Sequence, residues 1–179
     1  MNTSATGGYL LPDGGALTDE TLEDALQLHV VGITGLPGDL VRPRWARVVP
    51  KVPEPTVTWA ALGIKSVASD ASPLINQLEN NTEVIRHQLL NVLITFYGPQ
   101  GSSFATLFRD GLAIPQNNQQ LKTINASLID YGEVLAVPEL VNQQWVKRFD
   151  IAFRLRHKTR RIYQIKPILV QPDINLAKE

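Results

Sequence analysis

The residue types that most often carry acid–base or metal chemistry are sparse in this chain of 179 residues. Its three histidines, His29, His87 and His157, fall on a predicted helix, strand and turn, and none has the short spacing to a second ligand that metal sites show. Cysteine is absent, which excludes disulfides, thiolate zinc sites and cysteine nucleophiles. We therefore predict no metal and no cofactor, and we interpret His29 as a packed or boundary residue of an amphipathic helix.

The loops and carboxylates give no stronger sign of catalysis. The segments "TGLPGDL" at 34–40 and "YGPQGSS" at 97–103 contain glycines but lack the phosphate-binding and dinucleotide-binding fingerprints. No GxSxG elbow of a serine hydrolase occurs. The neighbouring carboxylates Glu23 and Asp24 fall on a predicted solvated helix face. We predict no catalytic residues, and hence a protein that is not an enzyme.

Charge is balanced overall but segregated along the chain. Residues 1–39 contain six acids and neither lysine nor arginine, whereas residues 145–166 contain eight lysines and arginines against Asp150. A neutral chain is a poor general polyanion binder, so the asymmetry favours a local role for each charged end.

The basic stretch has three readings. It can be a solvated sheet face that guards an edge against aggregation. Nucleic-acid binding would need exposed aromatic side chains among the basic ones, but Phe149 and Phe153 have the opposite strand parity to Arg154 and Arg156. The third reading is an interface with the acidic end of a neighbouring copy, which would be head-to-tail and can close into a ring. We predict an interface formed by Arg148, Arg154, Arg156, Lys158, Arg160, Arg161, Asp19, Glu20, Glu23 and Asp24.

The elements that would position these residues can be read from periodicity. A helix is expected at 18–34, with Thr18 as N-cap, Leu17 in a hydrophobic staple and Gly35 as C-cap. Its apolar face follows the i, i+3, i+4 spacing and comprises Leu22, Ala25, Leu26, His29, Val30 and Ile33. Two further helices are expected, one capped by Ser102 or Ser103 with Phe104, Leu107, Phe108 and Leu112 inward, and a short one opened by Pro115.

Strands are expected at 39–45 as a short edge strand, at 56–67, at 84–98, and at 127–141 as one strand or two short ones. The clearest alternation runs from Trp145 to Arg156, with Trp145, Phe149, Ile151, Phe153 and Leu155 on the apolar face. We expect loops at 49–55 and 69–81, a turn at "HKTR" (157–160), and a returning strand after it. The order predicts an α+β fold, a mostly antiparallel β-sheet with helices packed on one side.

Composition indicates an ordinary globular chain, with 44% hydrophobic and 19% charged residues. No apolar run reaches the roughly 18 residues that a membrane span requires, and the first residues lack the pattern of a secretory signal. We expect a flexible N-terminal arm at 1–16, a single α+β domain at 17–170 and a flexible C-terminal tail at 171–179.

Several phrases in order resemble one known family. They are "GLPGDLVRPRW" (35–45), "TWAALGI" (58–64), "NVLITFYGPQG" (91–101), "FRDGLAIPQNNQQL" (108–121) and "PELVNQQWVKRFDIAFRLR" (138–156). They resemble the neck terminator proteins, also called tail terminators, of contractile-tailed bacteriophages and prophages, and the resemblance extends over about 30–170. No catalytic motif is carried over with the resemblance.

The resemblance implies a structural virion protein of the tail and neck, assembled in the host cytoplasm. Proteins of this family form a hexameric ring that ends the tail tube, docks the neck or head-completion protein, and can contact the last sheath ring. DNA passes through the ring without sequence-specific binding. Two alternatives stay open: a head–tail connector or tail-completion protein at another level of the neck, and a small nucleic-acid-binding protein that uses a basic C-terminal hairpin.

Overall fold

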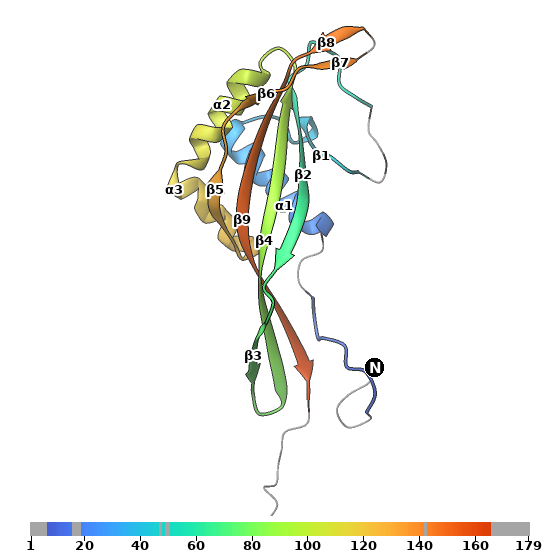
Figure 1. Ribbon diagram of the computed structural model, residues 1–179, viewed down its shortest axis with the longest axis vertical. Helices are drawn as coiled ribbons and strands as arrows, with labels where there is room; N and C mark the ends of the chain where they lie inside the picture. The colour runs from blue at the N-terminus through green and yellow to red at the C-terminus, as the bar shows by residue number, and fades with distance from the viewer. Residues whose placement is uncertain (1–6, 16–18, 47, 49–50, 142, 166–179) are drawn as a thin grey trace, which may run out of the picture.

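The computed structural model describes residues 7–15, 19–46, 48, 51–141 and 143–165 (Figure 1). The helices are α1 (Asp19–Thr34), α2 (Gly101–Leu112) and α3 (Pro115–Gln119), with 3-10 turns η1 (Gly38–Leu40) and η2 (Gln120–Ile124). The strands are β1 (Val41–Pro43), β2 (Trp59–Ser69), β3 (Leu74–Gln77), β4 (Asn81–Tyr97), β5 (Ala126–Tyr131), β6 (Leu135–Ala136), β7 (Glu139–Val141), β8 (Gln144–Val146) and β9 (Arg148–Gln164).

The sheet is built around two long strands. β4 and β9 pair antiparallel without a break from Asn81↔Gln164 to Tyr97↔Arg148. β2 pairs antiparallel with β4, and the short edge strand β1 runs parallel to β2. β5 and β6 complete the other side of β9, while β7 and β8 form a separate ribbon. The helices lie on one side of this sheet (Figure 1), which confirms the predicted α+β class.

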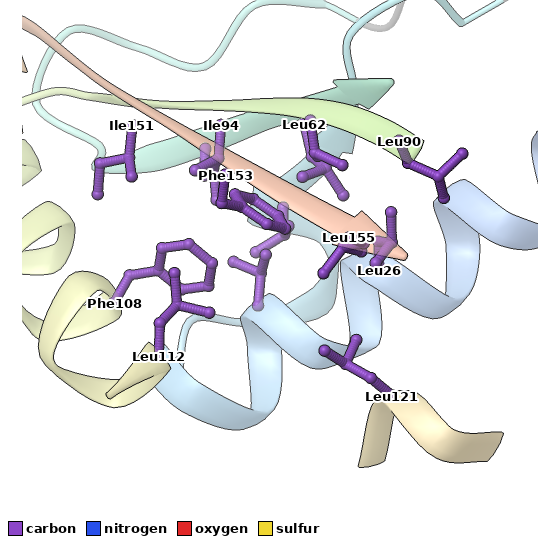
Figure 2. Packing of buried hydrophobic residues seen from close by; sticks show 14 of the residues in the cluster. Leu26, Leu62, Leu90, Ile94, Phe108, Leu112, Leu121, Ile151, Phe153 and Leu155 are labelled. Atoms are coloured by element: carbon purple, nitrogen blue, oxygen red, sulfur yellow. The ribbon is translucent and has the colours of Figure 1, made fainter. Parts of the chain in front are cut away.

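The core lies between the sheet and the helices (Figure 2). Phe108 of α2 packs against Phe96 of β4 and Phe153 of β9, with ring centroids 5.9 and 5.8 Å apart. Tilted and edge-on aromatic pairs of this kind add to the burial of the rings themselves. The alternating pattern of β4 and β9 thus supplies one apolar face, and the helices remove it from water.

The predicted apolar face of helix α1 is confirmed. Leu22, Leu26 and Val30 are buried against the sheet. Gly35 ends the helix with φ +71°, and its N–H donates to the carbonyl of Val31 at 2.8 Å, as an αL cap requires. The predicted caps at 17–18 lie outside the described residues.

Helix α2 differs from its prediction at two points. It begins at Gly101, so Ser102 and Ser103 lie inside its first turn and cap nothing. Leu107 is exposed, and Ala105 takes the buried position instead. The close crossing with α1 explains Gly111 of α2, because a Cβ at this position would lie 2.2 Å from Cγ2 of Ile33. Such an approach suits glycine alone.

Pro115 opens α3 at its first turn, as predicted. The edge strand predicted near 39–45 is β1, and the segment 127–141 forms β5, β6 and β7.

Two predictions for polar segments are wrong. The predicted loop at 69–81 contains β3, which pairs with β4 through a tight turn closed by the hydrogen bond from Leu78 N–H to the Asn81 carbonyl at 2.8 Å. The predicted turn at 157–160 lies inside β9, which runs on to Gln164. His157 and Thr159 continue the inward parity of Leu155 and are buried, so the strand has no reason to turn there.

The predicted inward position of Trp145 is also wrong. Trp145 lies on β8, in the separate ribbon with β7, and is 70% exposed. Lys147 separates β8 from β9, so the parity counted back from Phe149 does not apply to it.

Candidate assembly surface

The basic residues of β9 divide by strand parity. Arg148, Arg154, Arg156, Lys158 and Arg160 share the side of the sheet away from the buried face, and Arg161 lies on the opposite side. The structure therefore brings most of the predicted basic residues onto one face. These basic residues fall into two groups, those that are paired with acidic residues and those that are not.

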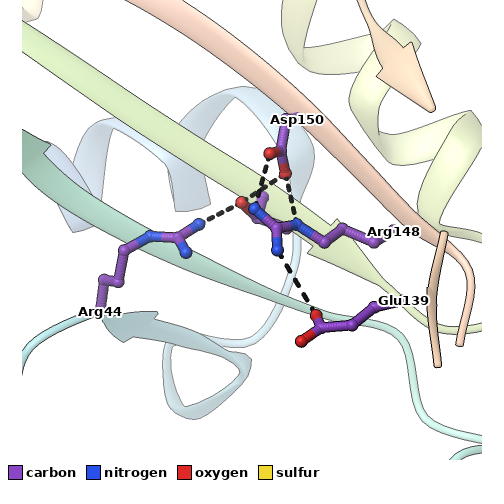
Figure 3. A network of polar contacts seen from close by, with 5 residues as sticks. Arg44, Glu139, Arg148 and Asp150 are labelled. Atoms are coloured by element: carbon purple, nitrogen blue, oxygen red, sulfur yellow. Dashed lines mark hydrogen bonds and ion pairs between the residues drawn. The ribbon is translucent and has the colours of Figure 1, made fainter. Parts of the chain in front are cut away.

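Arg148 belongs to a polar network at the end of the sheet (Figure 3). Its Nη2 donates to Oδ2 of Asp150 at 2.7 Å and its Nε to Oδ1 at 2.9 Å, a bidentate pair. The hydroxyl of Thr95 also donates to Asp150 Oδ1, at 2.7 Å, and Arg44 donates to that hydroxyl. Glu139 of β7 lies 3.4 Å from Arg148 Nη1. The network joins β4, β7 and β9 to Arg44, which follows β1 in the chain.

Electrostatics agree with this tight pairing. Burial raises the pKa of Asp150, but the hydrogen bonds from Arg148 and Thr95 and the charges of Arg148 and Arg44 outweigh it and hold the pKa below its usual range. The hydrogen bond to Asp150 raises the pKa of Arg148 in turn. The Arg148 and Asp150 side chains are only 21% and 12% exposed. This pair holds the sheet together more than it offers charge to a neighbour.

Two further arginines are paired at the surface. Arg154 Nε donates to both carboxylate oxygens of Asp130 on β5, at 2.8 and 3.0 Å. Arg160 pairs with Glu83 of β4. The hydrogen bond from Arg154 lowers the pKa of Asp130, and that from Arg160 lowers the pKa of Glu83.

The remaining basic residues keep their charge available. Within the described residues, Arg156, Lys158 and Arg161 make no ion pair. Arg156 and Lys158 line a surface hollow of about 250 Å³ together with His87 and Lys122. These side chains are the part of the basic stretch that is free to meet an acidic partner.

The acidic residues of α1 divide in the same way. The carboxylate of Glu23 accepts the backbone N–H of Ile64 at 3.0 Å, where β2 has a register shift. Such a contact satisfies a ladder donor that the bulge leaves open. Glu20 and Asp24 are exposed and form no ion pair among the described residues. Asp19 begins the helix, and its side chain lies outside the described part of the structure.

Sequence reasoning missed several aromatic side chains that are partly or largely exposed. Trp59 stacks on Tyr97 with centroids 4.3 Å apart, and Arg42 lies over the Trp59 ring at 5.9 Å. Trp45 and Trp145 are exposed. The signal in the sequence was weak, because the three tryptophans are far apart and follow no common period.

Two histidines are packed residues. His29 is 7% and His157 is 2% exposed, and burial lowers the pKa of both. In the part of the chain that the structure describes, His, Asp and Glu form no group of three or more that could hold a metal ion. Nor does any described helix have the length and apolarity needed to cross a membrane.

Comparison with known proteins identifies one family. The family model described as phage neck terminator protein matches residues 20–178, nearly the whole chain. No curated protein matches the chain.

Proposed function

The chain belongs to the phage neck terminator family, a structural family of the virion tail and neck, and from that premise we propose that it forms a hexameric ring. The ring ends polymerisation of the tail tube at its head-proximal end and joins the tail to the neck or head-completion protein. It also contacts the last sheath ring, lets the genomic DNA pass through its centre, and assembles in the host cytoplasm. The family match carries this proposal.

The charge distribution supports a head-to-tail ring. Within the described residues, Glu20 and Asp24 on α1 and Arg156, Lys158 and Arg161 on β9 are unpaired charges of opposite sign on different elements. A contact between two different patches repeats around a ring when its rotation closes. Complementary charges of this kind also speed association and exclude wrong partners.

Deletion of the gene from its phage or prophage, with wild-type complementation as the control, tests the function. We expect heads and tails that do not join, with tail tubes of irregular length. A cryo-EM reconstruction of complemented particles should show a sixfold ring between the tube and the neck. Density at another level of the neck would favour the connector alternative, and absence of the chain from purified particles would overturn the proposal.

A further inference from the structure

One part of the sheet projects beyond the helices. We call it the arm: β3 with residues 81–87 of β4 and 158–164 of β9 (Figure 1). Asp13 touches the edge of the arm through an isolated β-bridge with Ile162. Because this contact is made at the edge of β9, both faces of the arm remain available for contact with a neighbouring molecule.

On one face of the arm, neighbouring strands align a row of three side chains. Ile75 pairs with Val84, and Val84 pairs with Arg161. Cross-strand neighbours like these lie side by side on one face. Ile75 is 61% exposed, and Arg161 has no ion pair within the described residues. The row thus combines an uncovered aliphatic group with an unpaired positive charge.

We call the rest of the sheet, with the helices packed on it, the body. The row continues the sheet face that the helices cover in the body. Arg161 has the same parity along β9 as Phe153 and Leu155, which are buried against α1 and α2. A sheet face with apolar residues is normally covered by a helix or a second sheet. In the arm that cover is absent from the described chain, because the helices end before it begins (Figure 1).

Helix α1 offers the complementary surface. Glu20, Asp24 and Leu28 recur every four residues and form one stripe along the helix. Leu28 is 71% exposed, and the two acids are unpaired among the described residues. The stripe cannot cover its own arm, because the opposite side of α1, with Leu22 and Leu26, is packed on its own sheet.

We propose that the Ile75–Val84–Arg161 row of one copy packs on the Glu20–Asp24–Leu28 stripe of the next copy. Ile75 contacts Leu28, and Arg161 pairs with Glu20 or Asp24. The dimensions agree: Ile75 and Arg161 are two strand spacings apart, about 10 Å, and Glu20 and Leu28 are eight helical residues apart, about 12 Å. The helix of the neighbour then covers the arm face as α1 and α2 cover the body.

Disulfide crosslinking tests this contact directly, because the chain has no cysteine of its own. The inference rests on the proposed ring, so the test uses particles assembled with the full chain. The double variant Leu28→Cys, Ile75→Cys should form dimers and higher multimers on oxidation, visible on a non-reducing gel. Each single variant should stay monomeric. The matched control is Leu28→Cys with Trp145→Cys, which places the second thiol on β8, outside the arm, and should give no multimers.

The outcomes separate the two proposals. Particles that contain the double variant but give no multimers would overturn the arm contact and leave the ring intact. A wild-type chain that is absent from purified particles would overturn the ring and the contact together. A charge reversal adds a second readout: Arg161→Glu should reduce incorporation into particles, and combination with Glu20→Arg and Asp24→Arg should restore it.

Discussion

The two halves of β9 follow the same alternation in different surroundings. In residues 148–155 the inward side chains meet α1 and α2, and the outward pair Arg148–Asp150 is itself largely shielded from water. In residues 156–164 the strand leaves the helices, and the Arg160 side chain, which pairs with Glu83, is 58% exposed against 21% for Arg148. The same alternation of side chains therefore gives contacts of different strength in the two halves of β9, because the strength of a contact depends on its burial and not on strand parity.

The largest difference in unfolding free energy should appear when aromatic residues of the same strand parity are replaced in the two halves of β9. Phe153→Ala removes a buried ring and should cost about 3–5 kcal/mol of unfolding free energy. Tyr163→Ala, in the arm, should cost about 1 kcal/mol or less. Chemical denaturation of both variants measures the contrast, and equal losses would show that the arm is packed as tightly as the body.

A smaller contrast should separate two arginine pairs. Arg148→Met leaves Asp150 without its main partner in a shielded site and should cost about 2–3 kcal/mol, somewhat below the value for a fully buried pair. Arg154→Met breaks a pair that water already screens, so the unfolding free energy should hardly change. Double-mutant cycles with Asp150→Asn and Asp130→Asn isolate each interaction, and a larger coupling for Arg154 would contradict this ranking.

The ion pair between Arg148 and Asp150 should also make the stability of the folded chain sensitive to acid. The pKa of Asp150 is lower in the folded chain than its unfolded value of about 3.9. Its contribution is therefore present above that unfolded value and is lost as the pH falls through the folded pKa. Between pH 5 and pH 2, Asp150→Asn should lose less stability than the wild type in urea titrations.

His157, at the boundary between the two halves, should give a modest pH effect nearer neutrality. Burial lowers its pKa, against a hydrogen bond with the backbone of Ile124 that raises it. The unfolded chain, with a histidine pKa of about 6.5, then binds more protons below that pH than the folded chain does. Stability should fall as the pH drops from 7 to 5, and His157→Gln should flatten this slope. An unchanged slope would assign the effect to His29.

The smallest effect is expected at Lys158. Its charge helps to lower the pKa of Glu83, but among the described residues its side chain forms no ion pair. Lys158→Ala should change the unfolding free energy of the free chain by no more than about 0.5 kcal/mol. Thermal unfolding checks this, and a clear loss of stability would show that the arm depends on its charges as the body depends on its core.

The fold class was predictable because two long strands and α1 keep their period. The alternation from Leu90 to Phe96 and the spacing of Leu22, Leu26 and Val30 each specify one buried face. The errors arose where polar residues suggested a turn. His157 and Thr159 keep the inward parity, so counting parity through them would have extended the strand. β3 has too few residues to show a clear period by itself.

The candidate surface was predictable only in its charge. The sequence shows where basic and acidic residues gather, but the partners that distinguish Arg154 and Arg160 from Arg156 come from other strands, far along the chain. Asp130 is 24 residues from Arg154, and Glu83 is 77 residues from Arg160. Which charges stay unpaired therefore depends on strand register, which a single sequence does not specify in advance.

The uninterrupted ladder between β4 and β9 has a mechanical consequence. Each strand contributes 17 residues, so the pair spans about 55 Å. Its hydrogen bonds lie across the strands, and tension along the strand axis therefore loads many of them at once in shear. A pull at right angles would instead peel them one after another. The β4–β9 pair should therefore resist tension along the strands better than tension across them.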